Sequence, residues 1–277
     1  MNINKQCGRL KVRCFKTPND LYIQCCSQLK KGKTMKKILI TGGFGKIGRY
    51  FIQNFNHKYE ITIADIVIDS RTFTNNVKIE KGNLMNFQTC LKLCTGIDTV
   101  IHLAGMVDPI SESDEVLDIN IKTTQNIFKA AVKSNCKRII FASSAQTIEN
   151  YPEEIQINKN MLVKPKNLYG VSKCFGEALA AYYSYKNGIS TICLRIGAYE
   201  FPKDFTEMNA RDLSAFLHPD DFNQLLIGCI ETENIKHEVL NAISNNRYKR
   251  LDISESREKV NYEPKADAFE LFKLAKK

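Results

Sequence analysis

Short apolar runs alternate with amphipathic helical patterns along most of this chain. The runs predict six strands, at residues 36–41, 60–65, 77–82, 99–105, 138–144 and 190–197. Helical patterns lie between them at residues 46–55, 86–94, 113–135 and 169–187, and no helix is expected between the second and third strands. This alternation is typical of βαβ units, so we predict an α/β fold with a doubly wound parallel sheet and a ligand at the carboxyl ends of its strands.

The alternation stops after residue 196. The remaining sequence contains one helical pattern at residues 220–231, one strand pattern at residues 237–244 and a polar tail. We therefore predict a nucleotide-binding domain over residues 35–196 and a small substrate-binding lobe over residues 197–277. Asp220 and Asp221 could form an acidic or metal-binding pair, but at the start of a helical pattern they are better explained as helix caps.

The first 34 residues form a basic leader without periodicity. It holds eight Lys and Arg residues and one acidic residue, so +7 of the net charge of +10 lies there and the other 243 residues carry only +3. This uneven distribution, together with the lack of a known nucleic-acid-binding motif, argues against a nucleic-acid partner. The leader could be a transit peptide, but an upstream start codon before Met35 or a disordered tail is favoured.

Cysteine usage and hydropathy bear on where the protein works. The ten cysteines form no CxxC pair, and no apolar run approaches the roughly 18 residues of a membrane helix. We expect reduced thiols, no metal site, no membrane partner and a cytoplasmic location.

A glycine-rich turn, TGGFGKIG, follows the first predicted strand and opens the first helix. Gly42 would permit the tight turn, Gly45 would let the backbone approach a pyrophosphate, and Gly48 would let the helix pack on the sheet. The helix then begins at Lys46 and Ile47. Asp65 ends the second strand, where a carboxylate can hold both ribose hydroxyls and would repel a 2′-phosphate, so NAD is favoured over NADP. The alternative is that Asp65 caps a loop.

Tyr169 and Lys173 stand four residues apart, and therefore on one helical face. An ammonium beside a phenol favours the phenolate, which can remove a proton from an alcohol. Either residue alone is common on solvated helices, so the interpretation depends on the pair together with the upstream glycine turn.

These motifs together resemble the extended short-chain dehydrogenase/reductase superfamily, also called the NAD-dependent epimerase/dehydratase family, which has a Rossmann fold. The resemblance runs from about Lys36 to the end of the chain. It implies that Asn83 and Leu84 flank the adenine, that Leu103, Ala104, Gly105 and Ile196 line the cofactor cleft, and that the catalytic set is Asn120, Ser144, Tyr169 and Lys173.

The roles implied by this resemblance suit the residue types. Tyr169 would take the hydroxyl proton, and Lys173 would hold the nicotinamide ribose and depress the Tyr169 pKa. Ser144 would hydrogen-bond the reacting oxygen, and Asn120 would steady a helix kink and a water.

The second half is similar to the uronate dehydrogenase group, whose members oxidise the C1 hydroxyl of a cyclic hexuronic acid to a lactone. Arg211 matches the arginine that binds the substrate carboxylate in that group, although it could also be a surface arginine. Ala145-Gln146 after Ser144 and Ala198 depart from the group's usual Asn-His and Ser, which leaves the substrate open.

We therefore predict an NAD-dependent oxidoreductase that acts on a sugar or sugar-acid hydroxyl. The alternatives are a nucleotide-sugar epimerase or dehydratase and a non-catalytic NAD-binding scaffold or sensor. The resemblance also implies a homo-oligomer that pairs through the two long helices.

Overall fold

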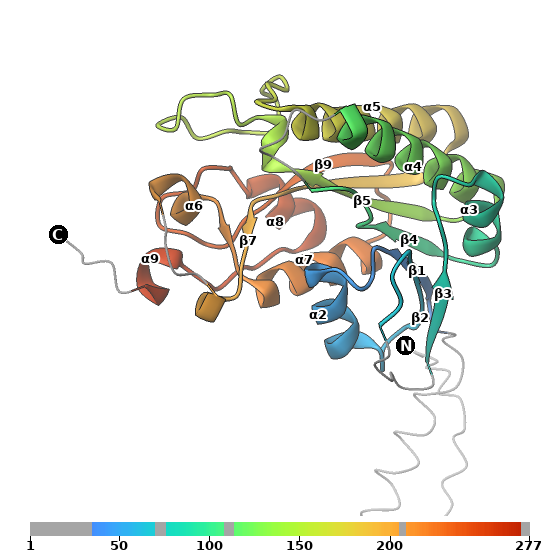
Figure 1. Cartoon of the computed structure of the whole chain (residues 1–277). Helices are drawn as coiled ribbons and strands as arrows, with labels where there is room; N and C mark the ends of the chain where they lie inside the picture. Colours follow the sequence, from blue (N-terminus) through green and yellow to red (C-terminus); the bar gives the residue numbers. More distant parts are fainter. Residues whose placement is uncertain (1–34, 70–75, 108–113, 205–208, 273–277) are drawn as a thin grey trace, which may run out of the picture. The chain divides into compact units, whose positions relative to one another are not determined.

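A parallel sheet forms the centre of the fold in the computed structural model, which describes residues 35–69, 76–107, 114–204 and 209–272. The predicted leader at residues 1–34 lies outside the described residues. Within them, seven parallel strands are arranged in the order β3-β2-β1-β4-β5-β6-β9 (Figure 1). The strands are β1 (Lys37–Thr41), β2 (Glu60–Asp65), β3 (Val77–Lys81), β4 (Thr99–His102), β5 (Arg138–Ser144), β6 (Ser190–Ile196) and β9 (His237–Ala242).

The strand order reverses between β1 and β4, which pair with each other in parallel. Such a switch point at the carboxyl ends of the strands is where doubly wound sheets bind ligands. The predicted fold class is therefore confirmed, and it locates the candidate site above the ends of β1, β4 and β5.

Helices cover both faces of the sheet (Figure 1). One face packs against α2 (Lys46–Phe55) and α7 (Pro219–Glu231), and the other against α3 (Phe87–Cys94), α4 (Asp114–Lys133) and α5 (Leu168–Asn187). Alternation along β1 explains this arrangement, because Ile38 and Ile40 enter the first core and Leu39 enters the second. A strand buried on both faces reads as a continuous apolar run, and this is the pattern from which the strands were predicted.

The predicted helices before residue 196 are confirmed as α2, α3, α4 and α5. Residues 66–69 and 76, between β2 and β3, contain no helix, and residues 70–75 lie outside the described part.

The last part of the chain is more closely joined to the sheet than its sequence indicates. The predicted helix and strand are present as α7 and β9, but β9 pairs with β6 at the edge of the main sheet. Residues from Lys36 onward belong to one compact unit, so the division at residue 196 stays a prediction.

Several short elements complete this region. They are β7 (Ala198–Tyr199), which pairs with β8 (Phe216–Leu217), the helices α6 (Ala210–Ser214), α8 (Ser254–Val260) and α9 (Ala268–Leu271), and the 3₁₀ turns η1 (Ala145–Thr147) and η2 (Pro202–Asp204). None of the helices in the described residues has the length and apolar character of a membrane span.

Candidate active site

The glycine turn between β1 and α2 is held in a shape that other residues would disturb. Gly42 has φ +67°, and a Cβ there would lie 2.7 Å from the backbone nitrogen of Ala104. A Cβ on Gly48 would lie 2.6 Å from the carbonyl oxygen of Gly43, so this glycine lets α2 approach the turn. Gly42 thus has the reason for glycine that the sequence predicted, a tight turn, whereas Gly48 approaches the turn at Gly43 and not the sheet.

The N-terminus of α2 offers its backbone to a ligand. Gly45 is the N-cap, no side chain caps the helix, and its first turn contains no acidic residue. An uncapped N-terminus that carries the positive end of the helix dipole is suited to a phosphate group. The side chain of Lys46, the first helical residue, forms an ion pair with Glu200.

Asp65 closes the second side of this turn. One carboxylate oxygen accepts a hydrogen bond from the Phe44 amide at 3.0 Å, and the other accepts from the Ile66 amide at 2.8 Å. The second oxygen also accepts from the Val67 amide at 3.3 Å. A carboxylate can accept about four hydrogen bonds, so Asp65 retains acceptor capacity for about one hydroxyl.

A cavity of about 810 Å³ lies in front of the turn. Most of the predicted cofactor-binding residues line it, namely Gly42, Gly45, Lys46, Ile47, Gly48, Asp65, Asn83, Leu84, Leu103, Ala104 and Gly105. Tyr169, Lys173 and Ile196, the other three predicted, are not among its lining residues. Gly105 connects the two groups, because a Cβ there would lie 3.4 Å from the Lys173 Nζ.

Ser144, Tyr169 and Lys173 converge beside this edge of the cavity. Ser144 ends β5, where the strand gives way to η1, and Tyr169 and Lys173 lie in the first two turns of α5. The Lys173 Nζ lies 5.4 Å from the centroid of the Tyr169 ring and 5.1 Å from that of Phe141. Three of the four predicted catalytic side chains therefore lie together.

Burial dominates the protonation of these groups. It raises the pKa of Tyr169 to about 12, an effect that a side-chain hydrogen bond with Ser144 partly opposes. It lowers the pKa of Lys173, whose residue is 5% exposed, to about 8. Lys173 is therefore largely charged at neutral pH. Burial outweighs the effect of this charge on Tyr169, whose pKa is raised and not lowered as the sequence predicted.

His102 at the end of β4 stays neutral next to this lysine. Burial, and then the charge of Lys173, lower the His102 pKa to about 3. Its ring nitrogens bond the hydroxyls of Thr41 at 2.7 Å and Thr124 at 3.2 Å. These contacts give His102 a structural role.

Asn120 ties α4 to the rim of the site. Its Oδ1 accepts from the Met106 amide at 2.7 Å, and its Nδ2 donates to the Met106 carbonyl oxygen at 3.0 Å and to the Ser172 Oγ at 3.1 Å. Ser172 in turn donates to the Tyr169 carbonyl oxygen at 2.7 Å. In this structure Asn120 therefore acts on the backbone that positions Tyr169.

The predicted substrate residues are placed around the end of β5. Ala145 is buried at the start of η1. The backbone amide of Gln146 donates to the Ser144 Oγ at 3.2 Å, and its side-chain Oε1 accepts from the Asn167 Nδ2 at 3.0 Å. Ile196, the register partner of Ser144, ends β6, and Ala198 follows in β7. The interpretation of Asp220 and Asp221 as helix caps is wrong, because His218 is the N-cap of α7. Asp220 instead accepts a hydrogen bond from Tyr50, and Asp221 accepts from Ser244 and from the amides of Lys265 and Ala266.

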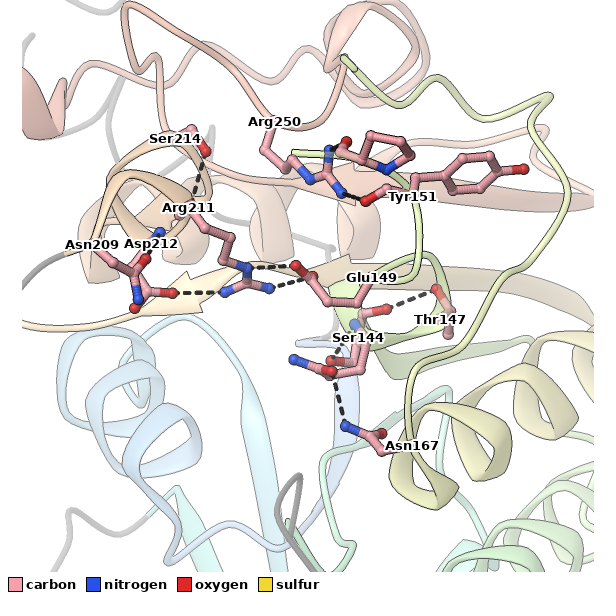
Figure 2. A network of polar contacts seen from close by, with 12 residues as sticks. Ser144, Thr147, Glu149, Tyr151, Asn167, Asn209, Arg211, Asp212, Ser214 and Arg250 are labelled. Atoms are coloured by element: carbon pink, nitrogen blue, oxygen red, sulfur yellow. Dashed lines mark hydrogen bonds and ion pairs between the residues drawn. The ribbon is translucent and has the colours of Figure 1, made fainter. Parts of the chain in front are cut away.

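Arg211 lies in α6 and reaches back to the segment after Ser144 (Figure 2). Its Nε and Nη2 donate to the two carboxylate oxygens of Glu149 at 2.8 and 2.5 Å, and its Nη1 donates to Asp212 at 2.8 Å. The side chain is 17% exposed, which excludes a free surface arginine. Although burial lowers the Arg211 pKa, the hydrogen bonds and charges of Glu149 and Asp212 raise it above its usual value.

Some lining residues were not foreseen from the sequence. They are Phe44, Arg49, Ile66, Val67, Gly82, Met85, Met106, Val107, Ile119 and Thr123. Ile119 and Thr123 are four residues apart on the face of α4 next to Asn120, so helical spacing could have identified them. Nothing in the sequence pattern indicated Glu149.

The residues present fit a dinucleotide. The uncapped helix start suits its phosphates, the remaining acceptor capacity of Asp65 suits a ribose, and the cavity has the volume typical of a cofactor site.

Comparison with known proteins agrees with this geometry. The model of the NAD dependent epimerase/dehydratase family matches residues 38–219. A uronate dehydrogenase from Pseudomonas syringae pv. tomato is 30% identical, with 86% of this chain and 84% of the relative covered. An L-arabinose 1-dehydrogenase (NAD(P)(+)) from Haloferax volcanii is 28% identical, with 83% and 97% covered.

A solved structure shares the fold. A mutant of uronate dehydrogenase from Agrobacterium tumefaciens, complexed with NAD, superposes with a TM-score of 0.79 at 29% identity, covering 87% of this chain and 88% of that chain.

Proposed function

This chain belongs to the NAD-dependent epimerase/dehydratase family, and on that basis we propose that it is an NAD-dependent dehydrogenase that oxidises a hydroxyl of a sugar or a sugar acid. The relatives that it matches over most of their length support this, since one is a uronate dehydrogenase and another an L-arabinose 1-dehydrogenase. The observation that carries the proposal is the convergence of Ser144, Tyr169 and Lys173 next to the cavity of the glycine turn.

The cofactor would be held by the backbone of the turn at Gly42, Gly45 and Gly48, by Asp65 at a ribose, and by Leu103 to Gly105 along the cleft. Asn83 and Leu84 would flank the adenine. Bound NAD would supply a hydride acceptor for the carbon that bears the reacting hydroxyl.

Tyr169 would take the hydroxyl proton at its phenolate oxygen. Burial raises the pKa of Tyr169 and so disfavours its phenolate form. The charge of Lys173 is therefore needed to favour the phenolate. Ser144 would hydrogen-bond the reacting oxygen as a carbonyl forms. Asn120 would act by positioning, through Met106 and Ser172.

A cytoplasmic location follows from the reduced thiols expected for this sequence, and the six cysteines in the described residues are free. A homo-oligomer is expected through α4 and α5.

The test is NADH absorbance with purified protein, NAD and a panel of free aldoses and uronates. We expect turnover on at least one sugar, and a loss of about a hundredfold or more in Tyr169→Phe, because the general base is removed. Tyr183→Phe, which removes a hydroxyl from the same helix outside the site, serves as the matched control. Turnover that persists in Tyr169→Phe would contradict the assigned base. NAD binding without turnover on any sugar would favour the epimerase or scaffold alternatives.

A further inference from the structure

In the Glu149–Arg211 pair, Glu149 accepts the hydrogen bonds through which the Arg211 guanidinium could otherwise bind an anion. Five N–H bonds make up the donor set of an arginine, and its two-nitrogen edge is the part that matches a carboxylate. In this chain that edge, Nε and Nη2, is filled by Glu149, while Nη1 is bonded to Asp212 (Figure 2). An external carboxylate therefore finds the edge of Arg211 already occupied by an internal one.

Glu149 lies on the segment that begins at the proposed catalytic serine. Glu149 follows Ser144 by five residues, and the segment between them is compact, because Thr147 Oγ1 donates to the Ser144 carbonyl oxygen at 2.8 Å and the Ile148 amide donates to the Ala145 carbonyl oxygen at 3.0 Å. The same short segment thus carries both the proposed catalytic serine and the carboxylate that engages Arg211.

The charges of the cluster also disfavour an anion. One guanidinium faces two carboxylates, so the group of Arg211, Glu149 and Asp212 has a net charge of −1. The side chains of Arg211 and Glu149 are only 17% and 9% exposed, and low exposure limits the screening of this charge by water.

We propose that the substrate is an uncharged aldose, and that Glu149 determines this specificity by occupying the guanidinium that would otherwise bind a hexuronate carboxylate. This inference rests on the proposed function, since it names the substrate class of the same site. It makes Glu149 the residue whose removal should admit uronates.

The experiment compares kcat/KM for D-glucose and D-glucuronate, with matched pairs of other aldoses and uronates, in the wild type and Glu149→Gln. The wild type is expected to prefer the neutral sugars. In Glu149→Gln the uronate-to-aldose ratio should rise about tenfold or more, because a charge-assisted bidentate contact becomes available. Glu153→Gln removes the same charge from an exposed position on the same segment, and its ratio should stay at the wild-type value.

A double variant, Glu149→Gln with Arg211→Gln, tests whether the guanidinium is responsible. It should lose the gained preference for uronates while still binding NAD. A wild type that prefers uronates, or a ratio unchanged in Glu149→Gln, would overturn the inference and leave the dehydrogenase proposal standing. If Glu149→Gln does not fold, the wild-type preference alone decides.

Failure of the proposed function gives a different result. It would appear as NAD binding without NADH formation from any sugar in any variant. Titration calorimetry of D-glucuronate into the NADH-bound protein then still tests the inference, because binding gained in Glu149→Gln supports it and equal binding in both proteins overturns it.

Discussion

At the scale of single residues, the site gathers ionisable groups where water is scarce. The Lys173 ammonium lies within 5.4 Å of the ring centroids of both Phe141 and Tyr169, and the neighbouring His102 is neutral. Removing an ammonium from water is costly unless an opposite charge lies nearby. In the part of the chain that the structure describes, no carboxylate is paired with Lys173, so its charge lowers stability, in agreement with the catalytic role that we propose for it.

This cost predicts a stabilising substitution. Lys173→Met should raise the free energy of unfolding of the NAD-free protein at pH 7 by up to about 3 kcal/mol, because the Lys173 pKa is lowered from 10.5 to about 8. Turnover should be lost in the same variant. Urea unfolding at pH 7 measures the change, with Lys166→Met as a control that removes an exposed charge from the same region.

The sign of the pH dependence follows from the same pKa. Between about pH 8 and 10.5 the unfolded chain binds this proton more tightly than the folded protein, so the Lys173 contribution to stability increases as the pH rises. The difference between wild type and Lys173→Met should therefore shrink as the pH rises from 8 to 10.5. A constant difference across this range would show that the lysine is not buried as a charge.

Most of the candidate site could be predicted residue by residue, because its chemistry lies in short motifs whose spacing fixes their geometry. Tyr169 and Lys173 are one helical turn apart, and the glycine turn joins a strand to a helix. The Glu149–Arg211 contact joins residues 62 positions apart, neither of which lies in a periodic pattern. Such a contact depends on how η1 and α6 pack, which local sequence does not specify.

At the scale of elements, two glycines at the start of α2 have different roles. Gly48 permits close packing against the backbone of Gly43, whereas a Cβ on Gly45 would meet only the Gly42 carbonyl oxygen, at 3.1 Å. One glycine thus serves the fold, and the other leaves room for a ligand.

A pair of alanine substitutions tests this separation. Gly48→Ala should lower the free energy of unfolding by about 1–3 kcal/mol, because its Cβ would displace backbone. Gly45→Ala should destabilise the protein less but weaken NAD binding about tenfold, because its Cβ would stand where the phosphates approach. Thermal unfolding without NAD and calorimetric titration with NAD measure the two effects. Equal destabilisation by both substitutions would contradict the assignment.

Sequence periodicity identified the long elements and missed the short ones. Strands buried on both faces and helices of eight or more residues give clear patterns, and all of these were predicted. The elements α6, α8 and α9 span five, seven and four residues, which is too short for a pattern to repeat. The pairing of β9 with β6 was also missed, since strand neighbours are set by tertiary contacts.

At the scale of the whole molecule, α5 presents apolar side chains to solvent. Val171, Tyr182 and Tyr185 are exposed on this helix, and their spacings of eleven and three residues place them on one face. A second copy of this chain packed against α4 and α5 would cover them, in agreement with the homo-oligomer that we propose.

Tyr182→Glu should therefore shift the protein toward the monomer. The new carboxylate would lie one turn before Lys186, which supports the helix, so the fold itself should be retained. Light scattering after size-exclusion chromatography measures the mass in solution, and Tyr248→Glu, at another exposed tyrosine, is the control. An unchanged mass in Tyr182→Glu would place the interface elsewhere.

The position of β9 affects how the protein is made. Its partner β6 is synthesised about forty residues earlier, so the edge of β6 stays unpaired while the intervening chain leaves the ribosome. An unpaired strand edge is a template for aggregation, and pairing of strands distant in sequence is slow. The nascent chain is therefore prone to aggregation until β9 has been synthesised, and a chaperone that covers the edge of β6 would reduce this risk. A product truncated before residue 242 could not complete the sheet.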